Sequence, residues 1–242
     1  MLNISSNLLS TPSILLIGNF DGVHLGHKHL LSYAKKLMVS TGLPVQVMVF
    51  DPFPSEFFKQ KIFRLQTNEE KIAMLNNTVK IKNICLQSFD KDFSQINAVD
   101  FAKKLGFELN IKHVVTGFNF KFGYKRQGDT KTLASSGNII SHCVGPFVKD
   151  GHKISSSIIR SHILDGNITK ANLLLGRKYS LTLGQKDSKA NTYLVSSELK
   201  SGQYKLIVDN SSVLVKIHNK KLYLPVEPVS KVVQFESFVQ EI

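Results

Sequence analysis

The sequence predicts an α/β domain with a parallel sheet, followed by a small antiparallel β domain. In residues 1–176, short continuous apolar runs alternate with segments whose apolar residues recur at helical spacing. This alternation is typical of a parallel sheet with crossover helices. In residues 177–242, short β-like runs follow one another between polar turns, as in a small antiparallel barrel or sandwich. We therefore predict a domain boundary between residues 176 and 177.

The elements of the first domain are expected in a regular order. A short buried strand at residues 14–17 leads through a glycine-rich turn into a helix from about residue 28, which ends before Gly42 and Pro44. Further strands are expected at residues 45–50, 84–86, 113–116 and 139–144, and further helices at 67–75, at 98–105 and, broken at Asp165-Gly166, within 154–176. In the second domain, the β-like runs lie at residues 179–184, 191–197, 203–209, 212–219 and 221–226.

The composition indicates a globular protein. A chain of 242 residues with 42% apolar content is large enough to bury a proper core. No apolar run approaches the length of a membrane span, and the first residues lack the basic and then apolar pattern of a secretory leader. We therefore expect a cytoplasmic protein without a membrane partner. Cys85 and Cys143 each lie in an apolar, strand-like segment and are expected to be reduced core thiols.

The net charge of +13 favours anionic partners. Nucleic acid, nucleotides and acidic membranes all fit that description. The basic excess is spread along the chain, without a basic arm or tail, and no nucleic-acid-binding module is recognisable. We therefore rank RNA binding last and expect no nucleic-acid partner. The composition leaves the oligomeric state open.

The stretch "GNFDGVHLGHK" places two histidines three residues apart where the first strand gives way to a helix. Glycines at such a turn let the backbone approach a bulky ligand, and the free N–H groups of the new helix favour a phosphate. Because residues i and i+3 share one side of a helical turn, His24 and His27 can face the same phosphate chain. Two imidazole donors suit the charge that develops on a transferring phosphoryl group.

Two other interpretations of this pair were weighed. A metal site would need further ligands, and Asp21 and His29 are the nearest candidates, whereas zinc usually takes more histidine or cysteine. Two surface histidines at a helix start would need no function at all. The flanking glycines after a buried strand favour the phosphate site, and neither a P-loop nor the glycine fingerprint of dinucleotide-binding domains is present.

"GNFDGVHLGHKHLL" resembles the nucleotidylyltransferase motif of the prokaryotic FAD synthetase family, the bifunctional riboflavin kinase/FMN adenylyltransferases. Five further segments resemble that family in the same order, so that the resemblance covers roughly residues 13–182. They are "VFDPFPSEFF", "RLQTNEEKIAML", "VVTGFNFKFGYKRQGD", "ISSSIIR" and "LLLGRKYSLT". The resemblance implies a Rossmann-like nucleotidylyltransferase domain and an FMN adenylyltransferase. In that reaction the FMN phosphate attacks the α-phosphorus of ATP, with Mg²⁺, to give FAD and pyrophosphate.

The resemblance also implies roles for individual residues. The expected catalytic residues are His24, His27, Asn119 and Arg160. The expected ATP-binding residues are Gly18, Asn19, Phe20, Asp21 and Gly22 in the first loop and Ser155, Ser156 and Ser157 at a helix start. The expected FMN-binding residues are Asp51, Pro52, Phe53, Phe118 and Phe120. Phe53 stands where the family often has a histidine, so an aromatic packing role replaces a polar one. The metal ligands are left open.

The second domain departs from the family pattern. The kinase domain of the family carries a P-T-A-N motif, and only Lys189-Ala190-Asn191 echoes it here. We therefore expect a shortened β domain without riboflavin kinase activity. Two alternatives to FMN adenylylation remain: a nucleotidylyltransferase with another phosphorylated acceptor, and a flavin- or nucleotide-binding remnant without catalysis.

Overall fold

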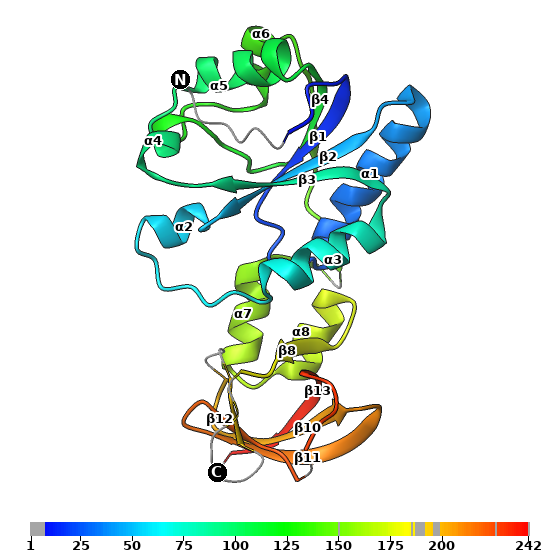
Figure 1. Cartoon of the computed structure of the whole chain (residues 1–242), viewed down its shortest axis with the longest axis vertical. Coiled ribbons are helices and arrows are strands. Elements are labelled where there is room, and N and C mark those ends of the chain that lie inside the picture. The colour runs from blue at the N-terminus through cyan, green and yellow to red at the C-terminus, as the bar shows by residue number, and fades with distance from the viewer. Residues whose placement is uncertain are drawn as a thin grey trace. The chain divides into compact units, whose positions relative to one another are not determined.

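The computed structural model describes residues 8–149, 151–184, 186, 192–195, 199–225 and 227–241. Its chain divides into two compact units, the first comprising residues 1–62 and 68–153 and the second residues 63–67 and 154–242. The boundary expected at 176/177 lies inside the second unit, after its helices, and as a domain boundary it stays a prediction. Each unit is described by itself below (Figure 1).

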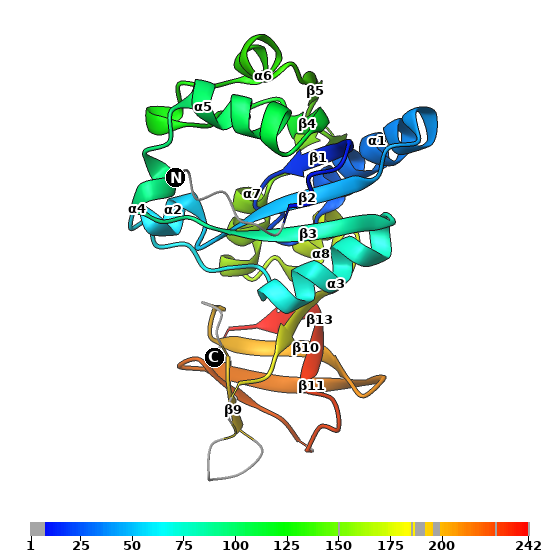
Figure 2. The same ribbon diagram turned by 45° about the horizontal axis from the view of Figure 1, so that its top comes forward.

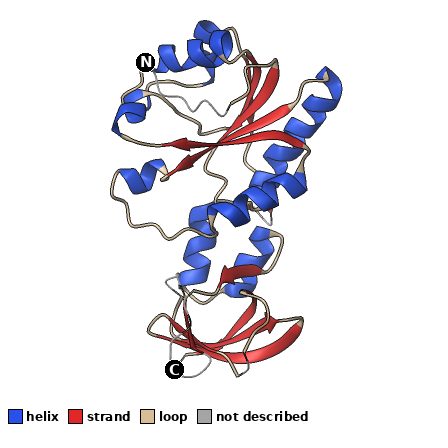
Figure 3. Cartoon of the chain, viewed as in Figure 1, coloured by secondary structure: helices blue, strands red, loops and turns tan. Residues whose placement is uncertain are grey.

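The first unit contains a five-stranded sheet in which all strands are parallel (Figure 3). The order is β3-β2-β1-β4-β5, so the strand order reverses between β1 and β4. In open α/β sheets, ligands bind beyond the carboxyl ends of the strands at such a reversal. The strands are β1 (Ser13–Ile17), β2 (Val45–Asp51), β3 (Ile81–Ser88), β4 (Ile111–Gly117) and β5 (Ile140–Val144).

Helices cover both faces of this sheet (Figure 2). Along β1, Ile14 and Leu16 belong to one apolar core and Leu15 and Ile17 to the other, because successive side chains of a strand point to opposite faces. β1 is therefore buried on both sides. The helices are α1 (Leu25–Thr41), α2 (Pro54–Phe57), α3 (Asn68–Thr78), α4 (Lys91–Ser94), α5 (Ala98–Lys103), the π-helical turn η1 (Lys104–Glu108), the 3₁₀ turn η2 (Tyr124–Arg126) and α6 (Thr130–Gly137). A hairpin of β6 (Val148–Lys149) and β7 (His152–Lys153) completes the unit.

The second unit begins with two short helices and continues as an antiparallel sheet of order β8-β13-β10-β11-β12-β9. The Gly184 N–H donates to the Leu194 carbonyl at 3.1 Å, which joins the chain after β8 to the opposite edge strand, so the sheet curls toward closure. Its elements are α7 (Ser156–Leu164), α8 (Ile168–Leu175), β8 (Tyr179–Thr182), β9 (Thr192–Leu194), β10 (Gly202–Val208), β11 (Ser211–His218), β12 (Lys221–Tyr223) and β13 (Val232–Gln240).

The predicted fold class is confirmed, with two corrections. The sequence analysis missed β13, which lies between β8 and β10 in the sheet, although Val233 and Phe235 are buried at alternating positions. Cys143 is exposed rather than a core thiol, because β5 is an edge strand with a partly open face; Cys85 is buried, and neither of these two cysteines forms a disulfide. The partial match to the kinase motif at residues 189–191 lies outside the described residues. No helix in the described part of the chain is long and apolar enough to cross a membrane.

Two glycines allow η1 and α6 to approach each other closely. A Cβ added at Gly106 would overlap the carbonyl oxygen of Gly137, and one added at Gly137 would overlap the carbonyl oxygen of Ala102. Main-chain atoms cannot move aside as a flexible side chain can. This contact therefore fixes α5 and η1 against α6 on one face of the sheet.

Replacing Gly106 with alanine is expected to lower the free energy of unfolding by about 1–3 kcal/mol, the cost of overpacking a filled interior. The matched control is Gly145→Ala, where a Cβ would meet nothing within 4 Å, and we expect a change below about 0.5 kcal/mol. Urea unfolding followed by circular dichroism measures both. Equal stabilities of the two variants would show that the close approach is not required.

Candidate active site

The loop between β1 and α1 has a strained backbone that is anchored in the core. Phe20 and Val23 adopt positive φ angles of 49° and 36°, and a β-branched residue rarely adopts such a conformation. Both side chains are buried, at 1% and 2% exposure, and the Val23 N–H donates to the Phe20 carbonyl at 3.1 Å. The buried side chains therefore hold the intervening Asp21 and Gly22 in a fixed turn.

The two histidines of the motif are brought together at the start of α1. His24 is the N-cap, and its Nδ1 accepts the backbone N–H of His27 at 3.3 Å. Because an accepting Nδ1 carries no proton, the proton of the neutral His24 ring is on Nε2. The two rings stack with centroids 3.7 Å apart and planes 17° apart. The Phe20 ring lies 5.2 Å from His27.

The His27 imidazole is held uncharged. Burial lowers the pKa of His27 well below its ordinary value of 6.5, and electrostatic interactions with His24 and Lys71 lower it further. Its buried Nδ1 has no hydrogen-bond partner among the described residues. The first turn of α1 contains no acidic residue, so its N–H groups keep their positive potential. Neutral imidazoles beside a helix N-terminus form a site for phosphate oxygens.

A second buried polar atom without a partner lies beside β1. The Oγ1 atom of Thr116 on β4 has no hydrogen-bond partner among the described residues. Leu16 pairs with Val115 in the sheet, so Thr116 is level with Ile17 at the carboxyl ends of the two strands. Unsatisfied buried polar atoms are uncommon and costly. Two such atoms lie next to the strand-order reversal. This is the pattern expected of a ligand site, where the ligand satisfies the hydrogen bonds of these atoms.

The loop after β4 carries Asn119 on a tight turn. The Phe120 N–H donates to the Gly117 carbonyl at 3.0 Å, which places Phe118 and Asn119 at the exposed corner. The Phe118 side chain is 44% exposed, and the Lys153 ammonium lies 4.0 Å above its ring. Asn119 is therefore accessible, as its predicted role requires, and the role itself stays a prediction.

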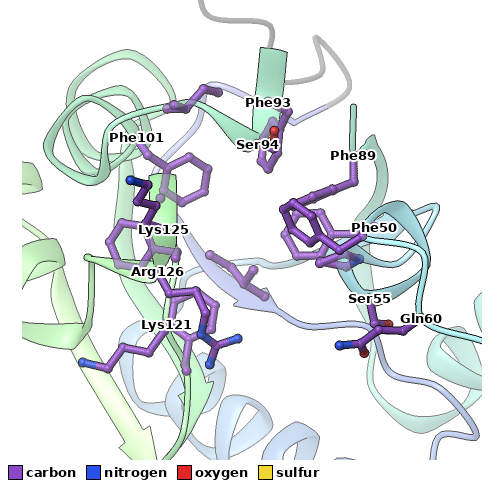
Figure 4. Close-up of a pocket in the computed structure, with 17 residues that line it drawn as sticks. Phe50, Ser55, Gln60, Phe89, Phe93, Ser94, Phe101, Lys121, Lys125 and Arg126 are labelled. Carbon is purple, nitrogen blue, oxygen red and sulfur yellow. The ribbon is translucent and has the colours of Figure 1, made fainter. Parts of the chain in front are cut away.

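An aromatic pocket of about 520 Å³ opens beyond the carboxyl ends of β1 to β4 (Figure 4). Ile17, the last residue of β1, lies in its wall. Ser55 and Gln60 line one side, and the cations Lys121, Lys125 and Arg126 lie on another (Figure 4). The aromatic wall consists of Phe50, Phe58, Phe89, Phe93, Phe101, Phe120 and Phe122.

Most of this aromatic wall was missed by the sequence analysis. Phe120 is among the residues predicted to contact FMN, whereas Phe50 and Phe89 were not named. A signal existed, because Phe50 lies at the end of β2, Phe89 follows β3 directly, and Phe120 follows β4. In a parallel sheet, these three positions meet at one edge.

The other residues predicted to contact FMN lie differently. The Phe53 ring is fully buried and does not line the aromatic pocket in the described part of the chain. Instead, the Lys71 ammonium lies 4.5 Å from its ring centroid, and the Glu56 carboxylate accepts its backbone N–H at 2.8 Å. Asp51 ends β2, and Pro52 is exposed directly after it. Contacts of these residues with FMN stay predictions.

The pocket's cations come from a tightly closed loop. Phe122 and Gly128 exchange backbone hydrogen bonds of 3.0 and 2.9 Å. Between them, Lys125 and Arg126 adopt positive φ angles of 52° and 60°, which is unusual for residues with a Cβ. A Cβ at Gly128 would come within 2.7 Å of Ala98 on α5. The packing thus holds two cationic residues in a strained conformation at the pocket.

The remaining predicted residues belong to the second unit. Ser155 caps α7, and its Oγ accepts the Ile158 N–H at 3.4 Å. Ser156 and Ser157 follow in the first turn of that helix. The Nε of Arg160 donates to the Phe63 carbonyl at 2.9 Å. The helix start expected from the sequence is therefore present, while contacts of these residues with ATP or pyrophosphate stay predictions.

Comparison with known proteins identifies the family of this chain. The profile of the FAD synthetase family matches residues 7–158. A bifunctional riboflavin kinase/FMN adenylyltransferase from Buchnera aphidicola of Acyrthosiphon pisum is 32% identical over 86% of this chain and 69% of its own length. Proteins of the same description from Bacillus subtilis and Escherichia coli K12 are 32% and 33% identical over 69% and 73% of this chain. The chain spans 54% and 59% of the lengths of those two relatives.

A solved structure also shares the fold. The structure titled "Crystal Structure of Macrolide-efflux Protein from Streptococcus pneumoniae" matches 99% of this chain and 89% of its own with a TM-score of 0.79, at 20% sequence identity. At that identity the match shows the fold alone. The family profile covers more than half of the chain, including both histidines and the loop after β4. This chain belongs to the FAD synthetase family.

Proposed function

We propose that this protein is an FMN adenylyltransferase, which transfers AMP from ATP to FMN and produces FAD and pyrophosphate. The observation that carries the proposal is the position of Ile17, whose side chain lines the aromatic pocket while the next residue begins the two-histidine loop. A flat aromatic ring system with a phosphate at the end of a flexible chain matches that arrangement. The ring fills the pocket, and the phosphate reaches the histidines.

The reaction needs positioning and charge stabilisation rather than a protein nucleophile. An oxygen of the FMN phosphate forms a bond to the α-phosphorus of ATP, and the bond from that phosphorus to the pyrophosphate oxygen breaks. His24 donates from Nε2, and neutral His27 donates to the same phosphoryl group, where negative charge grows during transfer. The N–H groups of α1 and the turn at Gly18–Gly22 hold the triphosphate.

The aromatic pocket suits the isoalloxazine ring of FMN. Ligand pockets of about 300–1,000 Å³ are typical for small molecules, and phenylalanine rings offer stacking and edge contacts to a flat heterocycle. Lys125 and Arg126 add positive charge, which favours an anionic flavin over uncharged riboflavin, while Lys121 is paired with the Asp129 carboxylate at 3.1 Å. The pocket supports FMN over other phosphorylated acceptors, because small alcohols or sugars would leave its aromatic wall uncovered.

ATP is proposed to enter as its Mg²⁺ complex. No group of three or more His, Cys, Asp or Glu residues that could hold a metal occurs among the described residues. Mg²⁺ is commonly bound through substrate phosphates with one or two carboxylates and water. A cytoplasmic location, where ATP and FMN are present, completes the proposal.

An assay of flavin products tests the function directly. Purified protein is incubated with ATP, Mg²⁺ and either FMN or riboflavin, and the flavins are separated by chromatography. We expect FAD from FMN and no FMN from riboflavin. Failure to form FAD would contradict the proposed function, and FMN formed from riboflavin would show that the second unit retains kinase activity.

Replacing His27 with alanine is expected to lower kcat for FAD formation about 10²- to 10³-fold, the scale of losing one transition-state donor. The KM for ATP should change little, because the interaction strengthens during transfer rather than on binding. The control is His29→Ala, which changes an exposed histidine of the same helix and should leave kcat near the wild-type value. A normal kcat with a raised KM in His27→Ala would contradict this role.

Replacing Phe120 with alanine is expected to raise the dissociation constant for FMN. Loss of one stacked aromatic ring costs about 1–3 kcal/mol, equivalent to about 5- to 150-fold in affinity. Phe107→Ala serves as the control, because Phe107 is 65% exposed and lies outside the pocket. Quenching of FMN fluorescence on titration with protein measures both. Equal affinities in the two variants would place the flavin elsewhere.

A further inference from the structure

Three polar side chains of the first unit form a hydrogen-bonded chain outside the candidate active site. The Tyr33 hydroxyl on α1 lies 2.9 Å from Nδ1 of His142 on β5, and Nε2 of His142 lies 2.9 Å from Nδ1 of His113 on β4. The two imidazole rings have centroids 5.2 Å apart. The chain therefore joins one helix to two neighbouring strands.

The strand register places both histidines on the face of the sheet that α1 covers. Val115 on β4 pairs with His142 and belongs to the apolar core that includes residues of α1. His113 lies two residues before Val115 and therefore shares that face. β5 is an edge strand, whose backbone pairs within the sheet on one side only. The side chain of His142 adds a second attachment of this strand, to β4 and to α1.

The number of protons decides whether this chain of hydrogen bonds can form. A neutral imidazole has one donor and one acceptor nitrogen, and an imidazolium has two donors. With both rings neutral, or with one ring protonated, the protons can be arranged so that each contact joins a donor to an acceptor. With both rings protonated, the N–H groups of His113 and His142 face each other across 2.9 Å, and neither can accept.

The elements that carry the chain offer no carboxylate to balance a second charge. α1, β4 and β5 contain no Asp or Glu. On α1, His29 and Lys36 lie one turn from Tyr33 on the same side of the helix, and both are exposed. On β4, Lys112 precedes His113 and points to the opposite face. Two imidazolium rings at this point would therefore repel each other without compensation from these elements.

We propose that Tyr33, His142 and His113 form an acid-sensitive latch: they tie the edge strand β5 to β4 and α1 while at most one imidazole is protonated, and a second proton opens the contact. α1 begins at the two-histidine loop, and β4 leads to the loop with Asn119. The latch thus joins elements that carry the candidate active site, although it does not depend on the reaction proposed there.

The latch makes the stability of the fold depend on pH with a defined sign. Burial lowers the pKa of His113, and burial, followed by the electrostatic interaction with His113, lowers the pKa of His142. Unfolding returns both rings to the ordinary value of 6.5, so the unfolded chain binds more protons between pH 6.5 and the lowered pKa values. The free energy of unfolding is therefore highest above pH 6.5 and falls as the pH drops through that interval.

Urea unfolding at pH 7.5 and pH 5.0, followed by circular dichroism, compares the wild type with His113→Asn. The asparagine amide keeps a hydrogen-bonding group near the position of Nδ1 and takes up no proton, so a single titrating ring remains in the chain. Between the two pH values, we expect the unfolding equilibrium constant to rise about 2- to 12-fold more in the wild type than in the variant, which is the net contribution of one intramolecular hydrogen bond.

Two further variants serve as controls. His29→Asn changes an exposed histidine of α1 and should leave the pH dependence of stability at the wild-type level. Tyr33→Phe removes one hydrogen bond of the chain but no group that titrates between pH 5.0 and 7.5. It should therefore lower the stability by a similar factor at both pH values.

Amide hydrogen exchange locates the effect within the first unit. At pH 5.0, the amides of wild-type β5 should lose protection relative to those of β1, which lies between β2 and β4 in the sheet. In His113→Asn, β5 should keep its protection at this pH. An equal loss of protection in β1 and β5 of the wild type would show that the whole unit opens and would overturn the latch.

Two other results would also overturn the proposal. One is a His113→Asn variant that is destabilised equally at both pH values and keeps the wild-type pH dependence, because the pair would then have a packing role only. If His113→Asn does not fold, NMR titration of the wild-type histidines decides: rings of His113 and His142 that both titrate at or above pH 6.5, while β5 stays protected, exclude the latch. These measurements need no FAD formation, so the latch and the proposed function fail separately.

Discussion

The site depends on how β1 ends. The strand is buried on both faces until Ile17, and the chain must then leave the sheet at the point where the strand order reverses. The side chains of Phe20 and Val23, within the turn that follows, are buried in one of the two apolar cores. These two anchors force the left-handed backbone between β1 and α1 and fix the position of His24. The cost of that backbone is offset by apolar burial, so the loop is preorganised before any ligand arrives.

Preorganisation extends from the backbone to the charge of the site. The chain carries a net charge of +13, yet the motif histidine His27 has a lowered pKa and is neutral. The two facts are consistent, because nearby positive charge is part of what keeps an imidazole uncharged. In the proposed reaction, cations at the aromatic pocket and the N-terminus of α1 attract phosphate, while the imidazoles donate directional hydrogen bonds. Different groups therefore attract the phosphate and donate hydrogen bonds to it.

Sequence patterns predicted those parts of the molecule that depend on neighbouring residues. The alternation of apolar runs predicted the parallel sheet, and the glycines and histidines after residue 17 predicted the turn before α1. The aromatic wall was missed because Phe50, Phe89 and Phe120 meet through strand pairing between distant segments. The burial of Phe53 was missed for the same reason: its neighbour Lys71 lies eighteen residues along the chain on another element.

The aromatic pocket and the two-histidine loop impose one geometric condition on the acceptor. Ile17 and Gly18 are consecutive, so their distance along the chain is a single residue, about 3.8 Å. In the proposed reaction, an acceptor bound in the pocket presents its phosphate to His24 and His27. A flavin without a phosphate would present nothing to these histidines. The proposed function therefore requires a phosphorylated flavin.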